Sequence, residues 1–122
     1  MDIRTNPDHT RRFFTKMIQT ITIDEIVSGI AARFKPEKII LFGSYAQGTP
    51  DRESDLDLLI IQDTDLPRHQ RGVDIRLSLI GGKIPIDILV YTSEEYNREK
   101  NDRHSFLHSA LKTARVLYER ND

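Results

Sequence analysis

The chain has 122 residues and a mass of 14.2 kDa, which suits one small domain with a single core. Its 18 basic and 19 acidic residues give a formal net charge of -1, which argues against binding nucleic acid through bulk positive charge. The absence of cysteine excludes a disulfide scaffold, a zinc ribbon and a thiol nucleophile. No apolar run approaches the ~20 residues that a membrane span needs. We therefore expect a cytoplasmic protein with neither a membrane partner nor a direct nucleic-acid partner.

No internal repeat or flexible linker divides the chain, so we interpret residues 1–122 as one domain with residues 1–20 as an N-terminal helical extension. Within that extension, apolar residues recur at helical spacing behind basic ones. Such a basic amphipathic segment either packs on its own domain or docks on a partner. The apolar residues are Phe13, Phe14, Met17, Ile18 and Ile21, and the basic ones are Arg11, Arg12 and Lys16.

A capping-box pattern at Thr22 and Glu25 predicts that a helix begins there, and Pro36 predicts where it ends. One face of this helix is apolar and is formed by Ile23, Ile26, Val27, Ile30, Ala31 and Phe34. The continuous apolar run over 38–42 predicts a buried strand, which meets a short turn from Gly43 to Gly48.

A second strand is expected over 56–61. Asp65, Leu66 and Pro67 are typical of a helix start, and we expect that helix to bury Val73, Leu77 and Ile80 and to end at Gly81 and Gly82. A third strand over 85–91, helices from Thr92 and over 105–113, and a strand near 115–118 follow. The order predicts an α/β (α+β) fold with helices packed on a small mixed sheet, because two strands adjoin in sequence.

Three carboxylates stand out in the predicted strands. Asp55 and Asp57 bracket Leu56, so both leave one face of the strand while Leu56, Leu58 and Ile60 face the core. Asp87 lies inside an apolar strand, where a buried carboxylate needs a partner. Convergence of the three would raise their pKa values, and divalent cations would remove that conflict. Mg²⁺ suits such an oxygen-rich site, with two ions ~3.5–4 Å apart.

Gly43 and Ser44 form a candidate phosphate cradle, because glycine permits close backbone approach and the helical turn behind it presents free amides. Each feature also has a structural interpretation on its own. Asp55 would be a turn residue and Asp57 an exposed strand position. Asp87 would pair with a buried arginine, and Gly43 and Ser44 would form an ordinary strand-to-helix turn.

Gly43 and Ser44, followed after ten residues by Asp55-Leu56-Asp57 and later by Asp87, resemble the nucleotidyltransferase superfamily typified by DNA polymerase beta. The strings LFGSYAQGTPDRESDLDLLI and IPIDILVYTSEEY and the terminal VLYER are similar to the minimal nucleotidyltransferases, over about residues 22 to 120. The resemblance implies a polymerase-beta-like fold in which Asp55, Asp57 and Asp87 hold two Mg²⁺ ions. It also implies that Asp87 activates the acceptor hydroxyl, as a base or as a metal-bridging ligand, and that Gly43 and Ser44 contact the triphosphate. The reaction it implies is transfer of NMP from an NTP, with ATP the expected donor, to a hydroxyl.

One position departs from the family pattern. Gln47 stands where the family often carries a basic residue, which removes a charge-assisted contact to phosphate. Arg52 or Lys83 could supply that charge.

The motifs occupy most of the chain, so we expect the acceptor to bring its own binding surface. The resemblance implies a helical HEPN partner, an RNase toxin, which this protein would bind in a hetero-oligomer and modify with AMP on a tyrosine, acting as its antitoxin. Two alternatives stay open: a catalytically silent module that neutralises its partner by contact, and a small-molecule transferase of the aminoglycoside-modifying type.

Two further clusters have structural interpretations. Arg68, Arg71 and Arg76 with His69 could form a basic face on one helix, although such a row is more often only solvent-facing. His104 and His108 share the spacing of zinc-ligating histidines but have no third ligand, so we interpret them as a solvated or partner-facing pair.

Overall fold

The computed structural model describes residues 7–51 and 53–121, with side chains from residue 20 onward. The amphipathic face predicted for residues 11–18 and the candidate cation Arg52 therefore lie outside what is described. The elements, in chain order, are α1 (Pro7–Phe34), β1 (Lys38–Phe42), α2 (Gly43–Ala46), β2 (Leu56–Ile61), η2 (Arg68–Gln70), α3 (Val73–Ser78), β3 (Ile86–Tyr91), α4 (Ser93–Glu99), α5 (Phe106–Leu111) and β4 (Arg115–Glu119).

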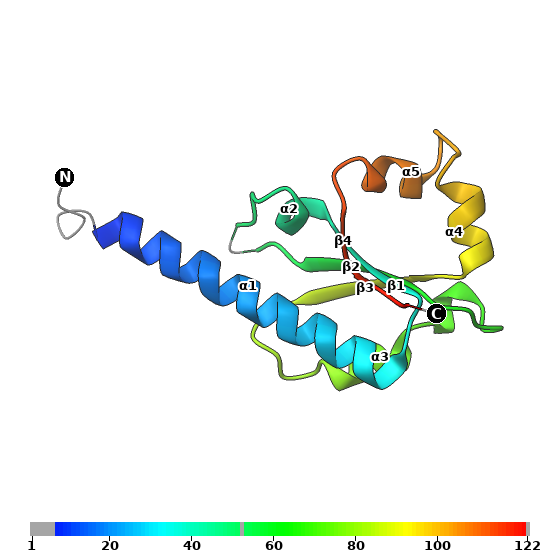
Figure 1. Cartoon of the computed structure of the whole chain (residues 1–122), viewed down its shortest axis with the longest axis horizontal. Helices are drawn as coiled ribbons and strands as arrows, with labels where there is room; N and C mark the ends of the chain where they lie inside the picture. The colour runs from blue at the N-terminus through cyan, green and yellow to red at the C-terminus, as the bar shows by residue number, and fades with distance from the viewer. Residues whose placement is uncertain (1–6, 52, 122) are drawn as a thin grey trace.

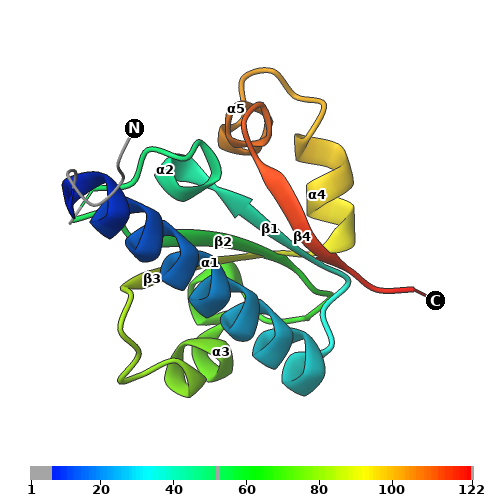
Figure 2. The same cartoon turned by 60° about the vertical axis from the view of Figure 1, so that its left-hand side comes forward.

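A four-stranded mixed sheet forms the centre of the molecule, in the order β3-β2-β1-β4. β1 runs antiparallel to both β2 and β4, whereas β2 and β3 are parallel. The parallel pair needs a crossover connection, which η2 and α3 provide. Figures 1 and 2 show α1 and α3 on one face of the sheet and α4 and α5 on the other. The predicted mixed sheet with packed helices is confirmed.

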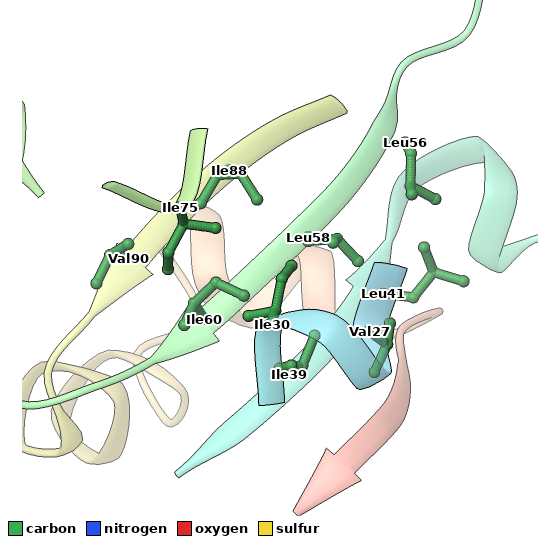
Figure 3. Packing of buried hydrophobic residues seen from close by; sticks show 10 residues of the cluster. All are labelled: Val27, Ile30, Ile39, Leu41, Leu56, Leu58, Ile60, Ile75, Ile88 and Val90. Atoms are coloured by element: carbon green, nitrogen blue, oxygen red, sulfur yellow. The ribbon is translucent and has the colours of Figure 1, made fainter. Parts of the chain in front are cut away.

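Both faces of the sheet are buried, which is why its central strands are almost continuously apolar. The first cluster lies under α1 and α3, and Figure 3 shows its side chains. It includes Leu56, Leu58 and Ile60, as their alternation along the strand predicts. The second cluster, under α4 and α5, consists of Ile40, Phe42, Leu59, Ile61, Tyr91 and Leu107.

The predicted start of the first helix at Thr22 is wrong. α1 runs without a break from Pro7 to Phe34, so Thr22 and Glu25 lie inside it. A capping box stabilises a helix start only where the preceding residue leaves helical geometry. Neither glycine nor proline occurs between Asp8 and Ser28 to cause that. The predicted end before Pro36 is confirmed, and the N-terminal half of α1 projects beyond the sheet (Figure 1).

The predicted helix after Pro67 is also wrong in its extent and in its buried face. A 3-10 turn ends at Gln70, and Gly72, at φ 76°, starts a separate helix that ends at Ser78 rather than at the later glycines. Because of this break, the residues of α3 face other directions than in one continuous helix from Pro67. Ile75 is the buried residue of α3, with 2% of its surface exposed. The residues expected to be buried are exposed instead: Val73, Leu77 and Ile80.

The two short helices on the other face begin as predicted. Thr92 and Glu95 form a complete capping box at α4, and the Ser105 side chain accepts a hydrogen bond from the His108 amide at the start of α5. Within the residues that the structure describes, no helix combines the length and the apolar character needed to cross a bilayer.

Arg71 is buried, with 8% of its surface exposed, and so does not belong to a basic helix face. Its Nη1 atom donates to Glu95 Oε1 at 2.6 Å, and its Nε atom donates to the carbonyl of Leu66 at 2.8 Å. Arg76 donates through Nη1 and Nη2 to the carbonyls of Arg71 and Ile88. These guanidinium groups therefore tie the α3 connection to β3 and α4.

Arg68 completes the same network. Its Nη2 atom donates to Glu99 Oε2 at 2.6 Å, and its guanidinium lies 4.6 Å from the centre of the Tyr91 ring. The arginines interpreted from the sequence as a row on one helix, more often solvent-facing, are thus distributed over η2, the following turn and α3, and their side chains stabilise the fold.

Candidate active site

The pairing of the strands brings the two predicted strand carboxylates together. Asp57 in β2 and Asp87 in β3 are direct partners in the parallel register, and Asp57 is also opposite Phe42 in β1. Paired residues in a sheet project from the same face. Because Phe42 belongs to the second cluster, this is the face that α4 and α5 cover. Asp57 and Asp87 therefore lie side by side near the first residues of their strands.

The burial expected for Asp87 is wrong: the residue is exposed, because it is near the start of an edge strand. Asp55 precedes β2 and is also exposed, whereas Asp57 is half-buried. Partial burial raises the pKa of the Asp57 carboxyl, and the negative charges of Asp87 and Asp55 raise that pKa further. The three carboxylates therefore interact electrostatically, with Asp57 at their centre.

Gly43 brings the backbone against this carboxyl group. It adopts φ +75°, and a Cβ atom at this position would overlap Asp57 Oδ2. Only glycine combines that conformation with such a close approach. The single turn of α2 follows at once, where the first amides of a helix have no intrahelical acceptor. The predicted cradle at Gly43 and Ser44 is therefore adjacent to Asp57.

The donor set fits Mg²⁺, whose usual protein site consists of one or two carboxylates completed by substrate phosphates. Oxygen donors are available from Asp57 and its neighbours Asp55 and Asp87, and a cation would relieve the repulsion that raises the Asp57 pKa. Within the described part of the chain, no three histidine, aspartate or glutamate side chains already form a ready-made metal centre. The arrangement therefore suits an ion that binds together with a phosphate group.

The segment after β1 forms only the short helix α2, as the short turn expected from Gly43 to Gly48 predicts, and Gln47 after it is exposed. The Gln47 amide closes the turn on the carbonyl of Gly43, and the Thr49 amide bonds the carbonyl of Ser44. Lys83, one of the two candidate substitute cations, is exposed in the turn before β3, at the same end of the sheet as Asp57.

The histidine pair shows no metal-site geometry among the residues described. His104 is exposed, whereas His108 Nδ1 lies 2.9 Å from the Lys100 carbonyl. A carbonyl only accepts, so Nδ1 carries the proton and the ring links α5 to the end of α4.

One aromatic side chain near the site was not predicted from the sequence. The Phe106 ring packs against Phe42, with ring centres 5.9 Å apart and an interplanar angle of 79°. The sequence predicted a helix over 105–113 but did not indicate that Phe106, its first helical residue, lies beside β1.

The site consists of carboxylates on neighbouring strands beside a turn that begins with glycine, and the mixed sheet that carries it is covered by helices. These features define a nucleotidyltransferase-type α+β domain. Residues 23–119 match the family model described as Nucleotidyltransferase domain, and the chain belongs to that family. It is therefore an enzyme that transfers nucleotidyl groups.

Two known proteins are similar to this chain. A Methanocaldococcus jannaschii protein, provisionally named a protein adenylyltransferase, is 37% identical over 98 residues, which cover 79% of this chain and 94% of that protein. A crystal structure from Sulfolobus solfataricus, provisionally described as a nucleotidyltransferase, matches with a TM-score of 0.61 and 22% identity, covering 88% of this chain and 86% of that one. The second similarity establishes the fold.

Proposed function

We propose that this enzyme transfers AMP from ATP to a hydroxyl group of a partner protein, in a Mg²⁺-dependent reaction at Asp55, Asp57 and Asp87. The observation that carries the proposal is the pairing of Asp57 with Asp87 at the point where Gly43 contacts the Asp57 carboxyl. The name of the Methanocaldococcus jannaschii relative, a protein adenylyltransferase, supports a protein as the acceptor and ATP as the donor.

Gly43 and Ser44 bind the triphosphate through backbone amides and the serine hydroxyl. Asp55, Asp57 and Asp87 would hold Mg²⁺, which would neutralise charge on the phosphates and on the carboxylates. Asp87 is exposed at the start of β3, so it can meet an acceptor that arrives from solution. The acceptor oxygen bonds to the α-phosphorus as the bond to the β-phosphate oxygen breaks and pyrophosphate leaves. Asp87 accepts the proton of the acceptor hydroxyl.

The acceptor that we propose is a tyrosine of a helical HEPN RNase toxin, so that the enzyme acts as an antitoxin. This step rests on the resemblance to the minimal nucleotidyltransferases. The exposure of Asp87 supports it, because a residue on a folded protein can approach an exposed strand end without entering a closed pocket.

A second candidate is an antitoxin that neutralises its partner by contact alone. Gln47 favours this function, because the exposed loop residue brings no positive charge to the phosphates.

The two functions are separated by incubating the enzyme with ATP labelled at the α-phosphate, Mg²⁺ and the protein encoded beside it. Asp57→Asn tests the carboxyl group, and Asp63→Asn, an exposed aspartate past the end of β2, is the matched control. We expect label on the partner with the wild type and with Asp63→Asn, and none with Asp57→Asn. Tight binding of the partner without transfer of label would support the contact-only function instead.

A further inference from the structure

Phe106 is an exposed aromatic residue on a short helix that is firmly anchored. Its surface is 57% exposed, although phenylalanine is usually buried. The next residue, Leu107, is fully buried in the second cluster and fixes α5 on the sheet. Ser105 caps the helix immediately before Phe106. The Phe106 ring is therefore held in place by its neighbours while much of its surface faces solvent.

This ring lies on the same face of the sheet as the carboxylates and at the same end. It packs edge to face against Phe42, whose ring centre is 5.9 Å away. Phe42 is the strand partner of Asp57 and directly precedes Gly43. Figures 1 and 2 both show α5 above the end of β1 from which α2 begins. A chain of direct contacts thus connects Phe106 to the phosphate cradle and to Asp57.

We propose that the exposed ring of Phe106 is a stacking platform for the base of the donor nucleotide. This inference rests on the proposed function, because it takes Gly43 and Ser44 as the triphosphate site. Flat apolar rings bind bases through their π-faces, and every nucleobase has one. The platform therefore contributes affinity for the nucleotide and does not by itself select adenine.

The position of the ring favours the donor over the acceptor. Phe106 lies over β1, the strand that leads into the phosphate cradle. The acceptor hydroxyl has to reach Asp87 on β3, and β2 separates β3 from β1. A group bound on Phe106 is therefore on the donor side of the site.

The test compares the binding of ATP with that of inorganic tripolyphosphate, by calorimetry with the full chain and Mg²⁺ and without an acceptor. Tripolyphosphate has the phosphates of ATP but no base. Phe106→Leu removes the ring and keeps an apolar side chain, whereas Phe106→Trp keeps an aromatic platform. Leu77→Ala is the control, because Leu77 is 59% exposed on α3, on the opposite face of the sheet.

We expect Phe106→Leu to weaken ATP binding about tenfold and to leave tripolyphosphate binding within about twofold of the wild type. Phe106→Trp should retain the affinity for ATP, and Leu77→Ala should change neither ligand. A triphosphate carrying the fluorescent base 2-aminopurine should be quenched by the wild type and less so by Phe106→Leu.

Three results would overturn the inference. If Phe106→Leu bound ATP as tightly as the wild type does, the base would not contact the ring. A raised KM of that variant for the acceptor would then show that the ring contacts the acceptor instead. Equal weakening of ATP and tripolyphosphate would show a general distortion of the site. A wild type that binds neither ligand would contradict both the proposed function and this inference.

Discussion

The α-carbon of Gly43 lies so close to the carboxyl group of Asp57 that no side chain fits between them. The strand pairing explains the contact, because Phe42 is opposite Asp57 and the chain turns into α2 at the next residue. The backbone at Gly43 therefore determines how close the start of α2 lies to the Asp57 carboxyl group.

Replacing this glycine should damage the site more than the fold. Gly43→Ala combines a positive φ with an overlap on Asp57 Oδ2, so we expect transfer activity to fall at least ~100-fold as the carboxyl group is displaced. Initial rates of AMP transfer measure the effect.

Gly48→Ala is the matched control, because Gly48 has the same φ of +75° but nothing within 4 Å of its added Cβ. Both variants should lose about 1–2 kcal/mol of stability from the backbone conformation, and only Gly43→Ala should lose most of its activity. Equal activity losses would refute the importance of the contact with Asp57.

Asp57→Asn should have opposite effects on activity and on stability. Activity should fall ~1000-fold, because the central carboxyl group is lost. In metal-free buffer at neutral pH, the variant should have a higher free energy of unfolding than the wild type. Partial burial and the charges of Asp87 and Asp55 raise the Asp57 pKa, so ionisation of Asp57 destabilises the folded state.

The pH dependence of that difference follows from the direction of the shift. The stability advantage of Asp57→Asn should be absent below the ordinary pKa of 3.8 and should grow as the pH rises through the raised pKa of Asp57. Urea unfolding from pH 3 to pH 7 measures it. A variant that is less stable than the wild type at pH 7 would contradict the electrostatic account.

Glu95 has the opposite pH signature. Its hydrogen bond with Arg71, the capping bond at Thr92 and the charge of Arg68 lower the pKa of Glu95 to about 2 from 4.5. At about 1.4 kcal/mol per pKa unit, Glu95→Gln should cost about 3 kcal/mol at pH 7. This stabilisation is complete above pH 4.5, so the difference should shrink as the pH falls from 4.5 toward 2.

Glu94→Gln is the control for that measurement. The neighbouring Glu94 side chain is 89% exposed and pairs with Arg98 at 3.8 Å. We expect it to contribute less than about 1 kcal/mol, as exposed ion pairs do. Similar losses in the two variants would mean that the contact between Arg71 and Glu95 adds nothing specific.

The buried face of α3 is tested by two neighbouring positions. Ile75→Ala should destabilise the protein by about 2–5 kcal/mol, because Ile75 is 2% exposed and belongs to the first cluster. Leu77→Ala should change stability by no more than about 0.5 kcal/mol, because Leu77 is exposed. Denaturant unfolding measures both losses. A larger loss of stability in Leu77→Ala than in Ile75→Ala would mean that α3 buries the face that the sequence pattern indicates.

The strands were predictable because each is a short apolar run between turn residues. Asp57 and Asp87 were recognisable as candidate site residues because they are charged positions within such runs. Where a single residue decides the local geometry, sequence patterns were less informative. The positive φ at Gly72 divides the segment after Pro67 and changes the buried face of α3. No helix-breaking residue interrupts α1 at Thr22, so the capping-box pattern of Thr22 and Glu25 lies inside a continuous helix.

Within the site, the sequence indicated which residues carry carboxylates but not how exposed they are. The exposure of Asp87 follows from the edge position of β3, which depends on the order of the strands. The packing of Phe106 on Phe42 joins residues far apart in the chain, so no local pattern could indicate it.

The most direct test of nucleotidyl transfer at these carboxylates uses ATP labelled at either the α- or the γ-phosphate, with Mg²⁺ and the partner protein. Transfer of AMP predicts that the α-label becomes attached to the partner, that the γ-label leaves as pyrophosphate, and that Asp57→Asn abolishes both. Attachment of the γ-label to the partner, or α-label transfer that persists in Asp57→Asn, would contradict the account.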